Sequence, residues 1–133
     1  MALLLDTHIL LWAMDTPQRL SADVQEMLAN RSQEVYFSAA SIWEIAVKAA
    51  LKKVDFQYHP DEIAETARQT GFIELPVTAA HGARVVDLPH HHGDPFDRLL
   101  LAQTLLLPAH FLTADSLLTR YSDLVRLIKP VVD

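Results

Sequence analysis

Residues 2–8 read Ala-Leu-Leu-Leu-Asp-Thr-His, a short apolar run that ends at Asp6. A continuous apolar run of this length predicts a strand that other elements cover on both faces. Apolar side chains follow at helical spacing at Leu10, Leu11 and Met14, so we expect a helix directly after the strand. A buried strand that leads straight into a helix is typical of α/β proteins.

The same alternation of apolar runs and helical patterns continues along the chain. Further strands are expected at residues 35–37, 72–75, 110–113 and 124–128. Helices are expected to begin at Ser21, at Ser38 or Ser41 and at Asp94-Pro95, and to cover residues 61–70, 78–87 and 116–121. Strands that alternate with helices indicate βαβ units and a parallel sheet. The predicted fold class is therefore α/β.

The composition is that of a globular protein, with 50% hydrophobic and 21% charged residues. We find no repeat, low-complexity tract or linker, and expect one domain over residues 1–133. The absence of cysteine excludes disulfides and thiolate metal sites. The N-terminus lacks the basic segment of a signal peptide, and no apolar run is long enough to span a bilayer. A cytoplasmic location without a membrane partner is expected.

The formal net charge of −6 leaves two interpretations of function open. Proteins that bind nucleic acids usually carry an excess of basic residues, so the charge alone slightly favours a protein that binds none. The acidic residues can instead be concentrated at a metal site, where bound cations reverse the local sign of the charge. The positions of the acids favour the second interpretation.

Four acidic residues are expected near one edge of the predicted sheet. Asp6 and Asp115 each follow a strand directly, Glu44 lies about two turns into a helix that follows a strand, and Asp97 lies in the first turn of the helix from Asp94. In parallel sheets, binding sites form beyond the carboxyl ends of the strands. Clustered carboxylates, with no cysteine and no histidine at ligand spacing within these segments, suit Mg²⁺ or Mn²⁺.

Each of these acids also has a structural interpretation as a helix cap. Asp6 and Asp115 can cap the helices that follow them, and Glu44 forms a capping-box pattern with Ser41. Asp94, three residues before Asp97, is interpreted as a cap without a catalytic role. No single acid decides the matter, and the prediction of a metal site depends on all four occurring together.

Four segments, in order, resemble the PIN-domain family. They are residues 3–8, with an aspartate after an apolar strand; residues 38–45, Ser-Ala-Ala-Ser-Ile-Trp-Glu-Ile; residues 94–103, Asp-Pro-Phe-Asp-Arg-Leu-Leu-Leu-Ala-Gln; and residues 113–115, Thr-Ala-Asp. The third segment is the most specific and is similar to that of the VapC-type toxins. The four segments together span nearly the whole chain.

The resemblance implies a three-layer α/β/α sandwich with a central parallel sheet of about five strands. It also implies a Mg²⁺- or Mn²⁺-dependent endoribonuclease, the toxin of a type II toxin–antitoxin pair of the VapBC type. An RNA substrate, a small antitoxin protein and a homodimer are the partners that it implies. By the same resemblance, Asp6, Glu44, Asp97 and Asp115 are catalytic metal ligands.

Further residues are candidates for supporting roles. Thr7, Ser38 and Thr113 are expected to hydrogen-bond to the acids or to their waters. Arg98 can touch phosphate or pair with an acid, and pairing is favoured. The cluster of Lys48, Lys52 and Lys53 is a candidate path for an RNA backbone or, as such clusters more often are, a solvated helix face.

Two other features are weighed against plainer alternatives. The histidines at 90–92 are expected to lie in a mobile loop near the site; a substrate contact is open, but adjacent histidines seldom converge on one zinc ion. Trp12 and Trp43 fall at apolar positions and are expected in the core or at a dimer interface.

Two other classes of function compete with the nuclease. One is a catalytically silent protein-binding module, against which the presence of all four acids counts. The other is a metal-dependent phosphatase, whose usual signature has a second aspartate two residues after the first. His8 occupies that position here, so the phosphatase is the weakest of the three hypotheses.

Overall fold

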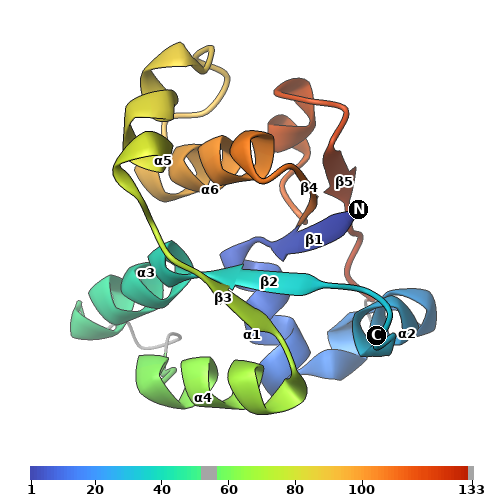
Figure 1. Cartoon of the computed structure of the whole chain (residues 1–133). Helices are drawn as coiled ribbons and strands as arrows, with labels where there is room; N and C mark the ends of the chain where they lie inside the picture. The colour runs from blue at the N-terminus through green and yellow to red at the C-terminus, as the bar shows by residue number, and fades with distance from the viewer. Residues whose placement is uncertain (52–56, 132–133) are drawn as a thin grey trace.

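The computed structural model of the chain describes residues 1–51 and 57–131. Its centre is a parallel five-stranded sheet in the order β3-β2-β1-β4-β5. Helices α1, α2 and α4 lie on one side of the sheet, and α5 and α6 lie on the other (Figure 1). The α/β class and the three-layer arrangement with five parallel strands are therefore confirmed.

The elements follow the predicted alternation. The strands are β1 (Ala2–Leu5), β2 (Val35–Ser38), β3 (Ile73–Leu75), β4 (Ala109–Thr113) and β5 (Val125–Leu127). The α-helices are α1 (Thr7–Asp15), α2 (Ala22–Ala29), α3 (Ala39–Ala50), α4 (Pro60–Thr70), α5 (Ala79–Arg84) and α6 (Pro95–Leu106). Three 3₁₀ helices complete the described chain: η1 (Pro17–Arg19), η2 (Val85–Asp87) and η3 (Ser116–Arg120).

Two predicted helices differ from the structure in type. Residues 78–87 form the short helix α5 and then the 3₁₀ turn η2, and the segment after Asp115 is the 3₁₀ helix η3. Both segments are short, and the tighter 3₁₀ turn is common in short connecting pieces.

The predicted start of α3 is resolved in favour of Ser38. The Ser38 hydroxyl accepts a hydrogen bond from the backbone N–H of Ala40, which satisfies one of the free N–H groups of the first turn. Ser41 lies inside the helix and is fully buried. The capping-box interpretation of Ser41 and Glu44 is therefore wrong, which leaves the Glu44 carboxylate for other contacts.

The sheet separates two hydrophobic clusters, one on each face. Alternate residues of β1 point to opposite sides, so Leu3 and Leu5 pack with α1, α2 and α4, whereas Leu4 packs with residues of α6 such as Leu100. Leu4 and Leu5 are completely buried. Burial of each such side chain contributes about 2 kcal/mol relative to exposure, which anchors the central strand.

The strand order reverses at β1. The chain passes from β1 outward to β2 and β3, and then returns to the other side of β1 for β4 and β5. Open α/β sheets bind ligands where the strand order reverses in this way, beyond the carboxyl ends of the strands. The backbone N–H of Asp6 donates to the carbonyl oxygen of Leu112 at 2.9 Å, so the ends of β1 and β4 lie side by side.

The two tryptophans differ in their surroundings. Trp12 packs partly buried against the core, with the guanidinium of Arg19 at 4.9 Å from the centre of its ring. Trp43 is 62% exposed and packs edge-on against Phe96, so the expectation of a core position is wrong for Trp43, whereas its alternative place at a dimer interface stays a prediction.

No helix within the described ranges combines the length and the apolar character that a bilayer crossing needs.

Candidate active site

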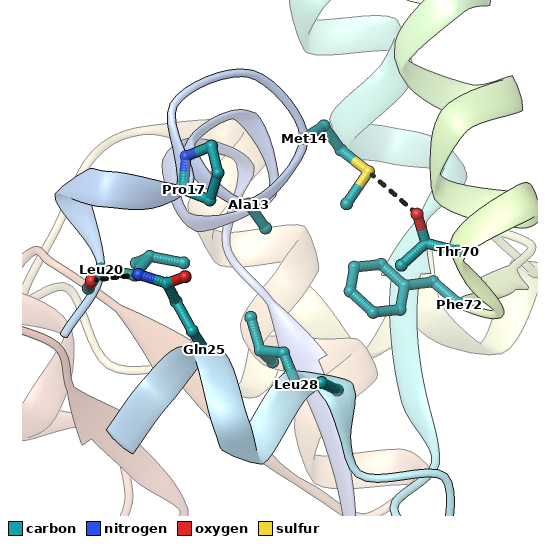
Figure 2. Close-up of a pocket in the computed structure, with 9 residues that line it drawn as sticks. Ala13, Met14, Pro17, Leu20, Gln25, Leu28, Thr70 and Phe72 are labelled. Atoms are coloured by element: carbon teal, nitrogen blue, oxygen red, sulfur yellow. Dashed lines mark hydrogen bonds between the residues drawn. The ribbon is translucent and has the colours of Figure 1, made fainter. Parts of the chain in front are cut away.

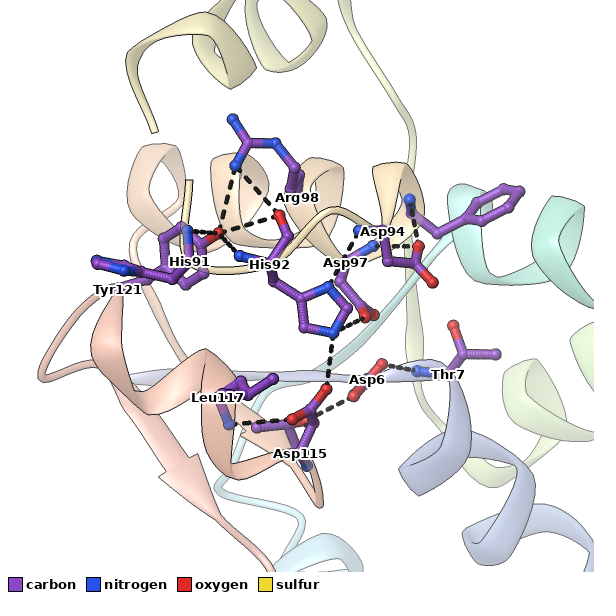
Figure 3. Close-up of polar contacts among 12 residues, drawn as sticks. Asp6, Thr7, His91, His92, Asp94, Asp97, Arg98, Asp115, Leu117 and Tyr121 are labelled. Atoms are coloured by element: carbon purple, nitrogen blue, oxygen red, sulfur yellow. Dashed lines mark hydrogen bonds and ion pairs between the residues drawn. The ribbon is translucent and has the colours of Figure 1, made fainter. Parts of the chain in front are cut away.

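The four acids predicted from the sequence line one cleft at the carboxyl edge of the sheet. The cleft has a volume of about 420 Å³, and Asp6, Glu44, Asp97 and Asp115 all contribute to its wall. Asp6 is the N-cap of α1, Glu44 lies in the middle of α3, and Asp97 lies in the first turn of α6. Asp115 is the N-cap of η3, two residues after β4. Figure 3 shows Asp6, Asp97 and Asp115 turned toward a common centre.

Asp6 is held from two sides. Its Oδ1 accepts a hydrogen bond from the backbone N–H of Thr7 at 2.7 Å, and its Oδ2 accepts one from the Thr113 hydroxyl at 2.6 Å. The side chain is buried, and burial raises the pKa of the Asp6 carboxyl, although both hydrogen bonds act in the opposite direction. Asp6 thus acts as the predicted cap of α1 and still faces the cleft.

Glu44 is buried and is also held at both oxygens. The Thr7 hydroxyl donates to Oε1 at 2.6 Å, and Lys48 Nζ lies 2.7 Å from Oε2. Partial burial lowers the pKa of Lys48, but the hydrogen bond and the charge of Glu44, together with Asp94 and Asp97, outweigh it, so the pKa is raised overall. Lys48 is therefore a cation of the cleft wall.

Asp97 has a strongly raised pKa. Burial, and then the charges of Asp6, Asp94, Glu44 and Asp115, raise the pKa of Asp97 from 3.8 to about 8. A carboxylate with such a pKa is largely protonated at neutral pH unless a cation replaces the proton. The site thus favours a positive charge close to Asp97.

Asp115 links the cleft to the following 3₁₀ helix. Its Oδ1 accepts from the backbone N–H of Leu117 at 3.0 Å, so it caps η3 as its alternative interpretation predicted. Its own backbone N–H donates to the Thr113 hydroxyl at 3.1 Å, and that hydroxyl donates to Asp6. Thr113 thereby couples the positions of Asp6 and Asp115.

Asp94 is the N-cap of α6, as predicted. Its Oδ1 accepts from the backbone N–H groups of Phe96 at 2.8 Å and Asp97 at 3.3 Å. Asp94 also lines the cleft, and its charge is among those that raise the pKa of Asp97.

The loop with the histidines at 90–92 lies near the site as expected, and the structure brings His92, to which the sequence interpretation gave no role beyond an open substrate contact, into the cleft wall. Its Nε2 lies 2.9 Å from Asp115 Oδ2 and 3.6 Å from Asp97 Oδ2, at the cleft wall. His8 lines the same cleft. The one signal for His92 in the sequence is its place two residues before the Asp94 cap, but its direction depends on how the loop folds back.

Two predicted supporting roles are corrected. The Arg98 guanidinium is buried and donates to the carbonyl oxygens of Pro89 at 2.9 Å, and of Val85 and Leu88 at 3.2 Å, so it neither pairs with an acid nor faces the cleft. The Ser38 hydroxyl donates to Gln103 Oε1 at 2.6 Å, away from the four acids.

The other supporting predictions fall differently. Thr7 and Thr113 do donate to the acids. Of the three lysines, Lys48 lines the cleft, whereas Lys52 and Lys53 lie outside the described residues.

The donor set of the cleft suits a hard divalent cation. Carboxylate oxygens from four different elements converge, and they leave Asp97 with a strongly raised pKa that a cation would relieve. Asp97, Asp115 and His92 each offer one atom within 4.8 Å of the others. Asp6, Glu44, Asp97 and Asp115 are thus the residues that could hold Mg²⁺ or Mn²⁺.

A second, smaller pocket has a different character. It has a volume of about 150 Å³, lies between α1, α2 and the end of α4, and is lined by residues such as Met14, Leu28 and Phe72 (Figure 2). None of its lining residues carries a charge, so it offers nothing to a metal ion.

Comparison with known proteins identifies the family. The profile of the PIN domain matches residues 3–124. The chain belongs to the PIN-domain family. PIN domains are generally nucleases and bind divalent metals. In this PIN domain, the acids of the cleft fall within the matched residues.

A solved structure has the same fold. It is a chain of the crystal structure described as VapBC2 from Rickettsia felis bound to a DNA fragment from their promoter. The alignment has a TM-score of 0.71 and 13% identity, and covers 97% of this PIN domain and 100% of the other chain. At that identity the likeness concerns the fold. A search of curated proteins found no match to the chain.

Proposed function

We propose that this PIN domain is a divalent-metal-dependent endoribonuclease that hydrolyses RNA phosphodiester bonds. The observation that carries the proposal is the convergence of Asp6, Glu44, Asp97 and Asp115 in one cleft where the strand order reverses. The raised pKa of Asp97 adds that this cleft favours a cation. The membership of a family of nucleases supports the choice of reaction.

The chain's own residues would hold and orient the reacting groups. Asp6, Glu44, Asp97 and Asp115 are the proposed ligands of Mg²⁺ or Mn²⁺, directly or through water. When bound, such an ion would act as a Lewis acid that activates water and stabilises charge on the phosphoryl group. Thr113 fixes Asp6, and Thr7 fixes Glu44, through hydroxyl donors at 2.6 Å in each case. These contacts favour one rotamer of each ligand before the ion arrives.

Lys48 is the proposed contact for the RNA backbone. Its ammonium group lines the cleft at 2.7 Å from Glu44, so a phosphate that enters would meet a positive charge beside the acids. The bound ions and Lys48 together would make the local charge of the cleft positive, although the net charge of the chain is −6. Arg98 is no longer a candidate, because its guanidinium is turned to buried carbonyl groups.

We further propose that the chain is the toxin of a VapBC-type pair. The segment of residues 94–103, which resembles that of VapC-type toxins, supports this, and so does the shared fold with a chain of a VapBC2 complex. A small antitoxin protein, a homodimer, a cytoplasmic location and a single domain over residues 1–133 belong to the same proposal. Size-exclusion chromatography of the purified chain, alone and after co-expression with a VapB-type antitoxin, tests the two protein partners.

Cleavage of a labelled total-RNA pool tests the enzymatic proposal. The purified chain is incubated with Mg²⁺, with Mn²⁺ or with chelator, beside Asp97→Ala and, as a matched control, Asp61→Asn. Asp61 is an exposed acid on α4 that does not line the cleft. We expect cleavage that needs a metal, disappears in Asp97→Ala and persists in Asp61→Asn.

The opposite result would favour the alternative function. If the wild-type chain and Asp97→Ala behave alike, both inert or both active, the carboxylates do not cleave RNA. A catalytically silent PIN domain that binds a protein partner would then be the better proposal.

A further inference from the structure

His92 is fixed in place by contacts on both sides of its ring. The backbone N–H of Asp94 donates to His92 Nδ1 at 3.0 Å, and His92 Nε2 lies 2.9 Å from Asp115 Oδ2. The side chain has a 20% exposed surface, and Figure 3 shows the ring between the α6 residues and Asp115. The ring therefore bridges the cap of α6 and the far wall of the cleft.

The contact with Asp94 decides which ring nitrogen carries the proton. A backbone N–H can only donate, so Nδ1 must offer its lone pair, and in the neutral ring the proton then resides on Nε2. Nε2 thus donates toward Asp115 Oδ2. To coordinate an ion through Nε2, the ring would need its proton on Nδ1, directly against the N–H of Asp94 at 3.0 Å. The backbone geometry opposes that arrangement.

The loop that carries His92 is itself held. The Tyr121 hydroxyl accepts from the backbone N–H of His91 at 3.0 Å and of His92 at 2.7 Å. Arg98 binds the carbonyl oxygens of Pro89 and Leu88 within the same loop. Because the backbone on both sides of His92 is fixed, the direction of its ring is set before any ion binds.

We infer that His92 is a positioning residue of the metal site: its Nε2–H donates to Asp115 Oδ2 and stands between the Asp115 and Asp97 carboxylates, and it is not a ligand of the ion. The donor fixes one rotamer of Asp115. It also places a partial positive charge 3.6 Å from Asp97 Oδ2, which reduces the repulsion between the two acids. Partners of this kind orient the groups that ligate metals. The inference rests on the proposed metal-dependent function.

Binding of Mn²⁺ to the full chain tests the inference without any reaction. Free Mn²⁺ is measured by electron paramagnetic resonance during titration of wild type, His92→Ala, His92→Gln and His90→Ala. Glutamine places an amide N–H close to the position of Nε2 and has no imidazole nitrogen that could coordinate the ion. His90→Ala is the matched control, because His90 is an exposed neighbour in the same loop that does not line the cleft.

The inference predicts loss and rescue of affinity. His92→Ala is expected to weaken Mn²⁺ binding about 10- to 100-fold, and His92→Gln to restore it to within about threefold of wild type. His90→Ala is expected to bind as wild type does. Pulsed measurements on wild type are expected to show no directly coordinated nitrogen, and this readout does not depend on how well any variant folds.

Four results would overturn it. Equal losses in His92→Ala and His92→Gln, or a directly coordinated nitrogen in wild type that is absent in His92→Gln, would make His92 a ligand. Unchanged affinity in a folded His92→Ala would remove its role altogether, while the proposed function would stand. If folded wild type binds no Mn²⁺ at all, the metal-dependent function fails together with this inference.

Discussion

At the scale of single residues, the ionised form of Asp97 is destabilised by its position in the cleft. Its neighbours Asp6, Glu44, Asp94 and Asp115 are all acids, and burial together with their charges raises the pKa of Asp97 to about 8. An isolated, solvated aspartate would keep a pKa near the ordinary value of 3.8. Because the raised pKa of Asp97 arises in the folded metal site, the protonation of Asp97 affects the free energy of unfolding of the chain.

Without divalent ions, the stability of the chain is expected to fall as the pH rises from about 4 to about 8. The folded state binds the Asp97 proton more tightly than the unfolded state does, so stability decreases between the unfolded pKa near 3.8 and the folded pKa of about 8. The loss is on the order of a few kcal/mol, reduced by the partial exposure of the group. Urea unfolding in chelator at a series of pH values measures it.

The variant Asp97→Asn provides the comparison for that measurement. An amide does not titrate, so the difference in unfolding free energy between variant and wild type should grow toward pH 8. Parallel pH profiles for the two proteins would show that Asp97 keeps an ordinary pKa in the folded chain.

Arg98 is expected to stabilise the fold and to leave RNA binding unaffected. Replacement in Arg98→Met removes donors to the carbonyl oxygens of Pro89, Val85 and Leu88, in contacts that are buried at Leu88 and partly buried at Pro89 and Val85. The expected loss of unfolding free energy is about 2–4 kcal/mol. Urea denaturation measures it, with Arg84→Met, an exposed arginine on α5, as the control. An unchanged stability with a weakened RNA affinity would restore the original expectation for Arg98.

At the scale of elements, the ends of the helices are the features that sequence predicts best. Ser21, Ser38 and Asp94 all accept hydrogen bonds from the first turns of α2, α3 and α6. Gly71 ends α4 with a φ of 100°, in the left-handed region that favours glycine. These signals are local, because a cap contacts backbone groups within three residues of itself.

Two glycines are expected to respond to alanine with opposite signs. Gly71→Ala should lower the free energy of unfolding by about 1 kcal/mol, because an L side chain at a φ of 100° is strained although the space around it is open. Gly82→Ala, inside α5 and equally open, should raise it by about 0.5–1 kcal/mol. Chemical denaturation of the two variants measures both. A stabilising Gly71→Ala would contradict the left-handed end of α4.

At the scale of the whole molecule, parallel topology explains which site residues could be predicted. Asp6 and Asp115 are 109 positions apart, yet both follow strands, and the rule for the carboxyl edge of parallel sheets brings them together. No such rule predicts the positions of the His92 and Arg98 side chains. The directions of their side chains depend on how the loop packs onto Tyr121 and α6, which is tertiary structure without a local signal.

The folded chain as a whole is expected to gain stability from divalent ions. An ion that binds the assembled cleft and not the unfolded chain stabilises by about 2.7 kcal/mol at a concentration 100 times its dissociation constant. Thermal unfolding with and without Mn²⁺ measures this gain. Asp97→Asn should lose most of this gain and Asp61→Asn should keep it, because Asp97 lines the cleft and Asp61 does not. An equal gain in all three proteins would place the bound ions elsewhere.

The most direct test of the central claim is calorimetric titration of Mn²⁺ into the wild-type chain at pH 7, in two buffers of different ionisation enthalpy. Because the pKa of Asp97 is about 8, its proton is largely bound at pH 7, and an ion that takes its place must release it. The account predicts binding with release of protons, of which Asp97 contributes close to one per chain, and loss of both the binding and this contribution in Asp97→Asn. Absence of binding, or binding that Asp97→Asn leaves unchanged, would contradict the assignment of the acidic cleft as a metal site.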